Sequence, residues 1–156
     1  MKRLTKNIHK EEGTIMNKQE EALALFKEGF SCSQAVFAVY AKEYGMDYEM
    51  ALKVSQGFGG GMGGMRGECG AATGAYMVIS LIYGRTKAED GESRLKTFSL
   101  VKKFNKRFRE IYQTSVCKEL LEGKSGNHYD MCSDYVKSAC EILEELLEEE
   151  TQKIDV

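Results

Sequence analysis

Four of the five cysteines in this chain stand at the predicted starts of helices, and they are Cys32, Cys69, Cys117 and Cys132. A thiol in the first turn of a helix faces unpaired backbone N–H groups and the positive end of the helix dipole, which favours the thiolate form. Thiolates attack disulfides and bind metals. The placement therefore predicts thiol chemistry, either redox exchange or a metal or cluster site.

A run of glycines precedes Cys69, and five of its members are candidates for wrapping around the thiol end of the next helix or holding a ligand there: Gly59, Gly60, Gly61, Gly63 and Gly64. Glycine suits this role because its N–H group is not shielded by a side chain. Two alternatives are a simple tight reversal and a dinucleotide-binding G-x-G-x-x-G fingerprint. A helix, and not the strand that the fingerprint requires, is predicted before the run.

Other groups near the cysteines could tune or join the site. Arg66 would favour a thiolate at Cys69, whereas Glu68 would oppose it. His128, close to Cys132 in sequence, could act as a ligand or a base, or could be a solvated loop residue. Cys140 lies ~12 Å beyond Cys132 along the same predicted helix. We therefore interpret Cys140 as a small buried hydrophobic residue or a spare thiol.

The composition predicts an all-α fold in a single domain. The chain has 156 residues, no proline and 16 glycines, so helices can run uninterrupted while glycines make the turns. Residues 1–15 read as a flexible tail that includes His9, residues 16–150 as the cysteine-bearing helical domain and residues 151–156 as a second tail. We expect a bundle of about six or seven helices with a glycine-rich loop before the central helix.

The apolar spacing and capping residues set the expected helices. Ser31 and Gln34 form a capping box that starts a helix at Cys32, after a first helix that ends at Gly29. The helices run to Gly29, from Ser31 to Gly45, from Asp47 to Phe58, from Cys69 to Tyr83, from Ser93 to Ile111, from Ser115 to Gly123 and from Asp130 through Leu147.

The order of these helices brings the four cysteines to one end of the bundle. If consecutive helices alternate in direction, the helices that start at Cys32 and Cys69 begin at the same end. The long helix after Tyr83 returns the chain to that end, where Cys117 follows. The next helix spans only about two turns, ~10 Å, so Cys132 also lies near.

The net charge of the chain and its expected location limit the kinds of partner that it could bind. A formal net charge of −2 gives no whole-chain reason for nucleic-acid or membrane binding. No secretory signal and no apolar stretch of membrane-spanning length is apparent, so we expect a cytoplasmic protein without a disulfide framework. The basic face on residues 93–111 could recruit an acidic partner protein or face the glutamates of residues 141–150.

The order of these motifs resembles the redox-active family named after its C_GCAxxG_C_C motif. The resemblance rests on Cys32, the segment Gly59–Gly63, the hexapeptide Cys69–Gly74, and then Cys117 and Cys132, and it covers residues 17–140. It implies a small cytosolic protein with four characteristic cysteines. It brings no established substrate, and it does not choose between redox exchange and metal binding.

Three functions follow as hypotheses. In the first, Cys69 is the attacking thiolate, Cys32 is its resolving partner, Cys117 and Cys132 form a second pair, and an unidentified redox protein is the partner. In the second, the same four cysteines hold zinc or an iron–sulfur cluster. In the third, the protein is a non-catalytic interaction protein, a homodimer through small-residue helix faces, with passive cysteines.

Overall fold

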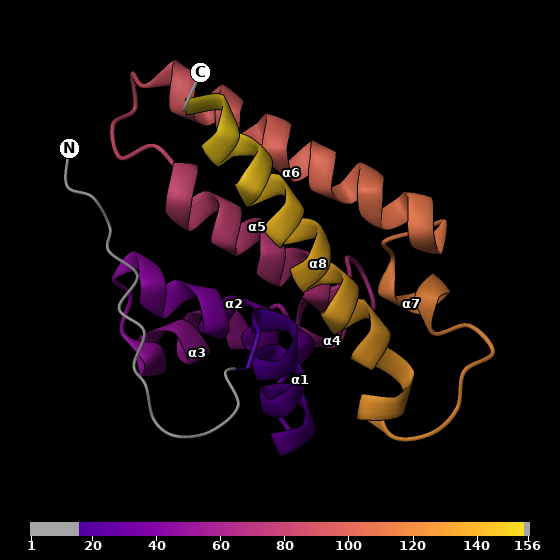
Figure 1. The fold of residues 1–156 in the computed structure, drawn as a ribbon. Helices are drawn as coiled ribbons and strands as arrows, with labels where there is room; N and C mark the ends of the chain where they lie inside the picture. Colours follow the sequence, from indigo (N-terminus) through magenta and orange to yellow (C-terminus); the bar gives the residue numbers. More distant parts are fainter. Residues whose placement is uncertain (1–15, 155–156) are drawn as a thin grey trace.

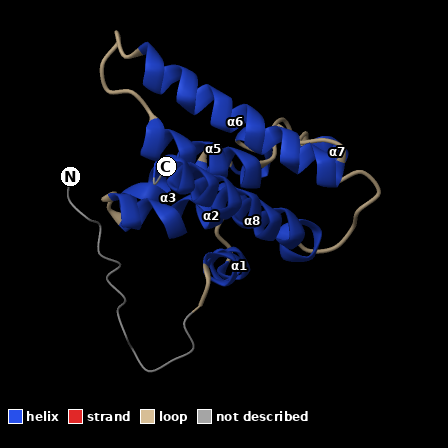
Figure 2. Ribbon diagram, turned by 45° about the horizontal axis from the view of Figure 1, so that its top comes forward, coloured by secondary structure: helices blue, strands red, loops and turns tan. Residues whose placement is uncertain are grey.

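The computed structural model describes residues 16–154, and the regular structure there is helical apart from one isolated bridge between two residues (Figure 2). The elements are α1 (Lys18–Glu28), α2 (Cys32–Ala41), the 3-10 turn η1 (Lys42–Tyr44), α3 (Tyr48–Gln56), α4 (Gly59–Met62), α5 (Gly70–Tyr83), α6 (Gly91–Tyr112), α7 (Cys117–Leu120) and α8 (His128–Ile154). The predicted all-α fold is confirmed. The predicted tail at 1–15, with His9, lies outside the described residues.

Several helix boundaries follow directly from side-chain caps. The Ser31 hydroxyl accepts from the Gln34 N–H while the Gln34 side chain accepts from the Ser31 N–H, so the predicted capping box is confirmed. Asp47 caps α3 as predicted. The predicted start of α6 at Ser93 is wrong, because the Asp90 carboxylate accepts from the Ser93 N–H and starts the helix at Gly91.

The remaining boundaries differ from prediction where loops pair or turn. The last helix begins at His128, before the predicted Asp130, because the Asn127 side chain accepts from the Asp130 N–H. The predicted start at Ser115 gives way to Cys117, because the backbone at Ser115 and Cys117 bonds to another segment. α8 continues to Ile154, beyond residue 150, where the sequence predicted a tail to begin.

α2 and α5 form the centre of the molecule. Every residue of α2 is buried, and α5 packs against α2 on one side and against α6 and α8 on the other. Figure 1 shows α6 on one side of α5 and α2 with α3 on the other, while α8 crosses the molecule and packs against α1, α5 and α6. None of the helices within residues 16–154 combines the length and apolar character needed to cross a bilayer.

Three apolar residues of α6 are exposed: Leu95, Phe98 and Ile111. The buried stripe is instead Thr97, Leu100, Phe104 and Phe108. These four recur at three- and four-residue spacing and so occupy one face of the helix, which places the other three beside that face. Met50 and Val54 on α3 are likewise exposed.

The small residues of α5 are used inside the chain, where they let α2 approach closely. A methyl group at Gly74 would lie 2.9 Å from the Ser33 carbonyl oxygen and 3.0 Å from the Val36 Cβ. Ala71 and Ala75 are completely buried. The small-residue face of α5 is therefore occupied by a helix of the same chain, and the homodimer of the third hypothesis stays a prediction.

We expect Gly74→Ala to lower the free energy of unfolding by about 1–3 kcal/mol, because the added methyl group overpacks the contact between α2 and α5. Gly57→Ala is the matched control: its backbone has φ −64° and no atom lies within 4 Å of an added Cβ. Urea unfolding followed by circular dichroism measures both. Equal midpoints for the two variants would contradict the close packing described here.

Candidate thiol site

The four predicted cysteines lie at the ends of four different helices and line one cavity. Cys32 begins α2, Cys69 is the N-cap of α5, Cys117 begins α7, and Cys132 is in the second turn of α8. The cavity has a volume of about 10 Å³, room for about one water molecule. The predicted convergence of the four cysteines is confirmed. All four are free thiols and are buried.

An isolated antiparallel bridge between Glu68 and Val116 holds two of the cysteines in register. On one side of the bridge, the Cys69 N–H donates to the Ser115 carbonyl oxygen at 2.7 Å. On the other side, the Cys117 N–H donates to the Gly67 carbonyl oxygen at 2.6 Å. These two bonds tie the start of α5 to the start of α7, although 48 residues separate the two cysteines in sequence.

The glycine run packs against the thiols. The Gly60 N–H donates to the Cys32 sulfur, and Gly61 lies so close to Cys117 that an added Cβ would be 2.6 Å from the Cys117 Cβ. Gly59 is buried against Ser31. These three glycines therefore lie against the starts of α2 and α7, and Gly59 also lies next to Gly70 at the start of α5; a role in holding a ligand stays a prediction. Gly63 and Gly64 are exposed and do not line the cavity.

The structural context of a dinucleotide fingerprint is not present around the glycine run. Helix α3 precedes it, and residues 16–154 contain no strand beyond the isolated bridge. The fingerprint requires a strand before the glycines and a βαβ unit around them. The run therefore lacks the context of a dinucleotide site, and one of its members, Gly60, lines the thiol cavity.

Burial raises the pKa of three of these thiols. It raises the pKa of Cys69 to about 12 and that of Cys132 to about 11, and it raises the pKa of Cys32 as well. N–H groups of Ala71 and Ala72 donate to the Cys69 sulfur and oppose this rise, as expected at a helix start, but they do not outweigh burial. The net direction of the shift at Cys69, which the opposing effects of Arg66 and Glu68 left open in the sequence, is therefore upward and set by burial.

Within residues 16–154, the cations beside the cavity lie near Cys117 and Cys132. The Arg66 Nη1 atom is 3.8 Å from the Cys117 sulfur, and Arg66 and Lys124 both lower the pKa of Cys132 against its burial. The main influences on the pKa of Cys32 and Cys69 include backbone N–H groups but no cation. We call Cys117 and Cys132 the cationic pair, and Cys32 and Cys69 the amide pair.

Arg66 and Glu68 do not act on Cys69 as predicted. Arg66 reaches Cys117 from a left-handed backbone with φ 62°. The Glu68 carboxylate instead accepts hydrogen bonds from Tyr76, Asn105 and Ser115 at 2.6–3.1 Å. Both charges therefore have partners other than Cys69.

The two remaining candidates occupy different surroundings. His128 lines the cavity, and its ring meets Phe26 edge-on with centroids 4.6 Å apart. Burial, with a smaller effect of Arg66, lowers the pKa of His128, so its imidazole is neutral at pH 7. Cys140 is fully buried in the core, as expected, and does not line the cavity. A role for His128 as a base stays a prediction.

The arrangement does not fit a bound metal ion. Within the part of the chain that the structure describes, no three His, Cys, Asp or Glu side chains come together in a way that could hold a metal. The cavity between the thiols is also the size of a water molecule, which leaves no room for an iron–sulfur cluster.

Sequence reasoning missed a polar cluster beside the thiols, formed by Glu68, Tyr76, Asn105 and Ser115. The Asn105 amide donates to the Tyr76 hydroxyl at 2.7 Å and to the Ser115 hydroxyl at 2.9 Å. Its members come from two helices and two loops, and no local spacing in the sequence connects them. Glu68 and Ser115 were considered only as neighbours of a cysteine and as a helix start.

One comparison with known proteins gave a match. A model of the family described as "Putative redox-active protein (C_GCAxxG_C_C)" matches residues 30–146, well over half of the chain. No curated protein and no solved structure matches the chain. The matched range contains the four cysteines of the cavity, the glycine run and the bridge between Glu68 and Val116.

Proposed function

This chain belongs to the redox-active C_GCAxxG_C_C family, and from that premise we propose that it is a thiol redox protein that exchanges with a disulfide of a partner protein. The observation that carries the proposal is the convergence of four reduced cysteines on one cavity that is flanked by cations on one side. In the cytoplasm, where we expect the protein to act, ordinary thiols are kept reduced and are available for such exchange.

The cationic pair is the better candidate for exchange with the partner. The thiolate is the reactive form, and a neighbouring guanidinium favours it. Arg66 contacts the Cys117 sulfur, while the burial that raises the pKa of Cys69 to about 12 leaves almost no thiolate there at pH 7. We therefore assign the attack to Cys117, and no longer to Cys69, with Cys132 as its resolving partner.

The exchange balances in two steps. The Cys117 thiolate attacks one sulfur of the partner disulfide, a mixed disulfide forms, and the other partner sulfur leaves and takes up a proton. Cys132 then loses its proton and attacks the Cys117 sulfur, which releases the second partner thiol. Two electrons and two protons pass from the cationic pair to the partner. Cys32 and Cys69 form the second pair and exchange internally with the first.

The test is to react the reduced protein with oxidised glutathione and to map the products by mass spectrometry. We expect a disulfide between Cys117 and Cys132 in the unmodified chain. Cys132→Ser should accumulate a glutathione adduct on Cys117, because the second step is lost. Cys117→Ser should slow the consumption of oxidised glutathione by about a hundredfold, because it removes the thiol that the Arg66 guanidinium contacts.

Cys140→Ala is the matched control, since Cys140 does not line the cavity, and its rate should equal that of the unmodified chain. Adducts on Cys140 alone, or four unreactive thiols, would contradict the proposal. Stoichiometric zinc or iron in protein purified without oxygen would also contradict it, because the thiols would then serve as ligands.

A further inference from the structure

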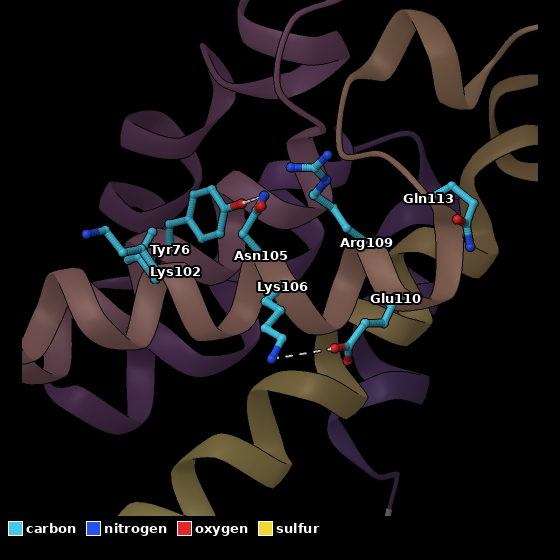
Figure 3. Close-up of a pocket in the computed structure, with 8 residues that line it drawn as sticks. Tyr76, Lys102, Asn105, Lys106, Arg109, Glu110 and Gln113 are labelled. Carbon is cyan, nitrogen blue, oxygen red and sulfur yellow. Dashed lines mark hydrogen bonds and ion pairs between the residues drawn. The ribbon is translucent and has the colours of Figure 1, made fainter.

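A groove of about 860 Å³ lies along the outer side of α6, next to the polar cluster. Figure 3 shows Tyr76 and Asn105 lying between Lys102 and Arg109, with the ion pair of Lys106 and Glu110 at the edge. Its lining carries three cationic side chains and one carboxylate. The groove therefore has a positive charge, although the chain as a whole has a net charge of −2.

Five of the seven basic residues of α6 divide into two sets with different surroundings. Lys96, Lys103 and Arg107 form ion pairs with glutamates of α8, namely Glu145, Glu149 and Glu150. This set confirms the predicted pairing between the basic and acidic faces. Lys102 and Arg109 turn to the groove instead, and neither forms an ion pair with any residue in the range 16–154.

The groove is shallow and long, which suits an extended chain better than a compact small molecule, because a small ligand is usually enclosed on most sides. Lys102 and Arg109 are seven residues apart on one helix, ~10 Å along its axis. An extended peptide covers that distance in about three residues. Acidic side chains near the two ends of such a segment would meet the two cations, with the Tyr76 ring and Val101 as an apolar wall.

We propose that this groove binds an extended acidic segment of the partner protein whose disulfide the thiols reduce. This inference rests on the proposed function. A short path joins the groove to the thiols: Asn105 donates to the Ser115 hydroxyl, and the Ser115 carbonyl accepts from the Cys69 N–H. A segment held in the groove is thereby held next to the α5 and α7 ends that carry Cys69 and Cys117.

The test measures binding without redox chemistry, by fluorescence anisotropy of a fluorescein-labelled poly-glutamate peptide and the full reduced chain. We expect binding that weakens as sodium chloride is added. The double variant Lys102→Glu and Arg109→Glu should bind about tenfold or more weakly. The double variant Lys27→Glu and Lys53→Glu is the matched control: it changes the net charge equally at exposed sites on α1 and α3, and its affinity should be unchanged.

Equal weakening of both double variants would show attraction to net charge alone and would overturn the groove proposal. No binding of poly-glutamate, or equal binding of a poly-glutamine peptide, would overturn it as well. Neither result affects the reaction with oxidised glutathione, which reports on the thiols alone. Conversely, if the protein bound the peptide but did not react with oxidised glutathione, the groove would still be a binding site for acidic peptides and the proposed redox function would be rejected.

Discussion

The free energy of unfolding is expected to fall steeply as the pH is raised from about 9 to about 11. Unfolded cysteines ionise near pH 8.5–9, whereas burial raises the pKa of Cys69 and Cys140 to about 12 and that of Cys132 to about 11. In this window the unfolded chain has lost protons that the folded chain still binds. Stability therefore decreases with pH, by about 1.4 kcal/mol per pH unit for each such thiol.

Urea unfolding under a reductant, at pH values from 7 to 11, measures this slope. Below about pH 8 the thiols are protonated in both states and add no pH dependence. Cys140→Ala is the informative variant, because it removes one buried thiol from the core without touching the cavity. Its slope between pH 9 and 11 should be smaller by the contribution of one proton. A free energy of unfolding that stays constant from pH 8 to pH 10 would mean that the thiols are not buried.

Gly61→Ala is expected to cost about 3 kcal/mol or more, the largest loss of any single substitution in the glycine run. Its backbone is left-handed with φ 70°. An added Cβ would lie 2.6 Å from the Cys117 Cβ, 2.8 Å from the Arg66 Cα and 2.8 Å from the Gly67 nitrogen. Two of these are backbone atoms of the loop itself, which cannot rotate away, and the third belongs to α7, so the loop must both deform and shift away from α7. Urea unfolding gives the loss.

A substitution at the adjacent Gly60 separates the cost of backbone strain from the cost of the steric clash. It is also left-handed, with φ 62°, yet an added Cβ would meet no atom within 4 Å. Gly60→Ala should therefore cost only the backbone strain, about 1 kcal/mol. Alkylation of Cys117 at neutral pH should accelerate in the Gly61 variant and not in the Gly60 variant. Equal losses of stability in the two variants would contradict the packing of Gly61 against Cys117.

Much of the fold and the meeting of the four cysteines could be predicted, because both depend on local signals. Ser31 with Gln34, Asp47 and Gly29 mark helix ends through neighbours a few residues away. The alternating direction of successive helices then places the four cysteines at one end of the bundle, and this step does not depend on how the side chains pack. The start of α6 was misplaced because Asp90 and Ser93 are both good caps, and the sequence alone does not say which one the backbone uses.

The electrostatics of the site could not be predicted in the same way. The pKa of Cys69 depends on how deeply the surrounding helices bury it, and burial depends on contacts between distant segments. Arg66 is three residues from Cys69 in sequence, yet the turn of the glycine loop directs it to Cys117, 51 residues away. The polar cluster around Asn105 joins residues up to 47 positions apart for the same reason.

At Arg66, which has a left-handed backbone, the residue that is best for stability differs from the residue that is best for the reactivity of Cys117. A residue with a Cβ costs about 1 kcal/mol or more in this conformation, and glycine would relieve that cost. Glycine would, however, leave the Cys117 sulfur without its guanidinium neighbour. Selection for thermal robustness alone would thus favour glycine at position 66, whereas selection for reactivity would retain arginine, so relatives that have lost the reaction should drift toward the smaller residue here.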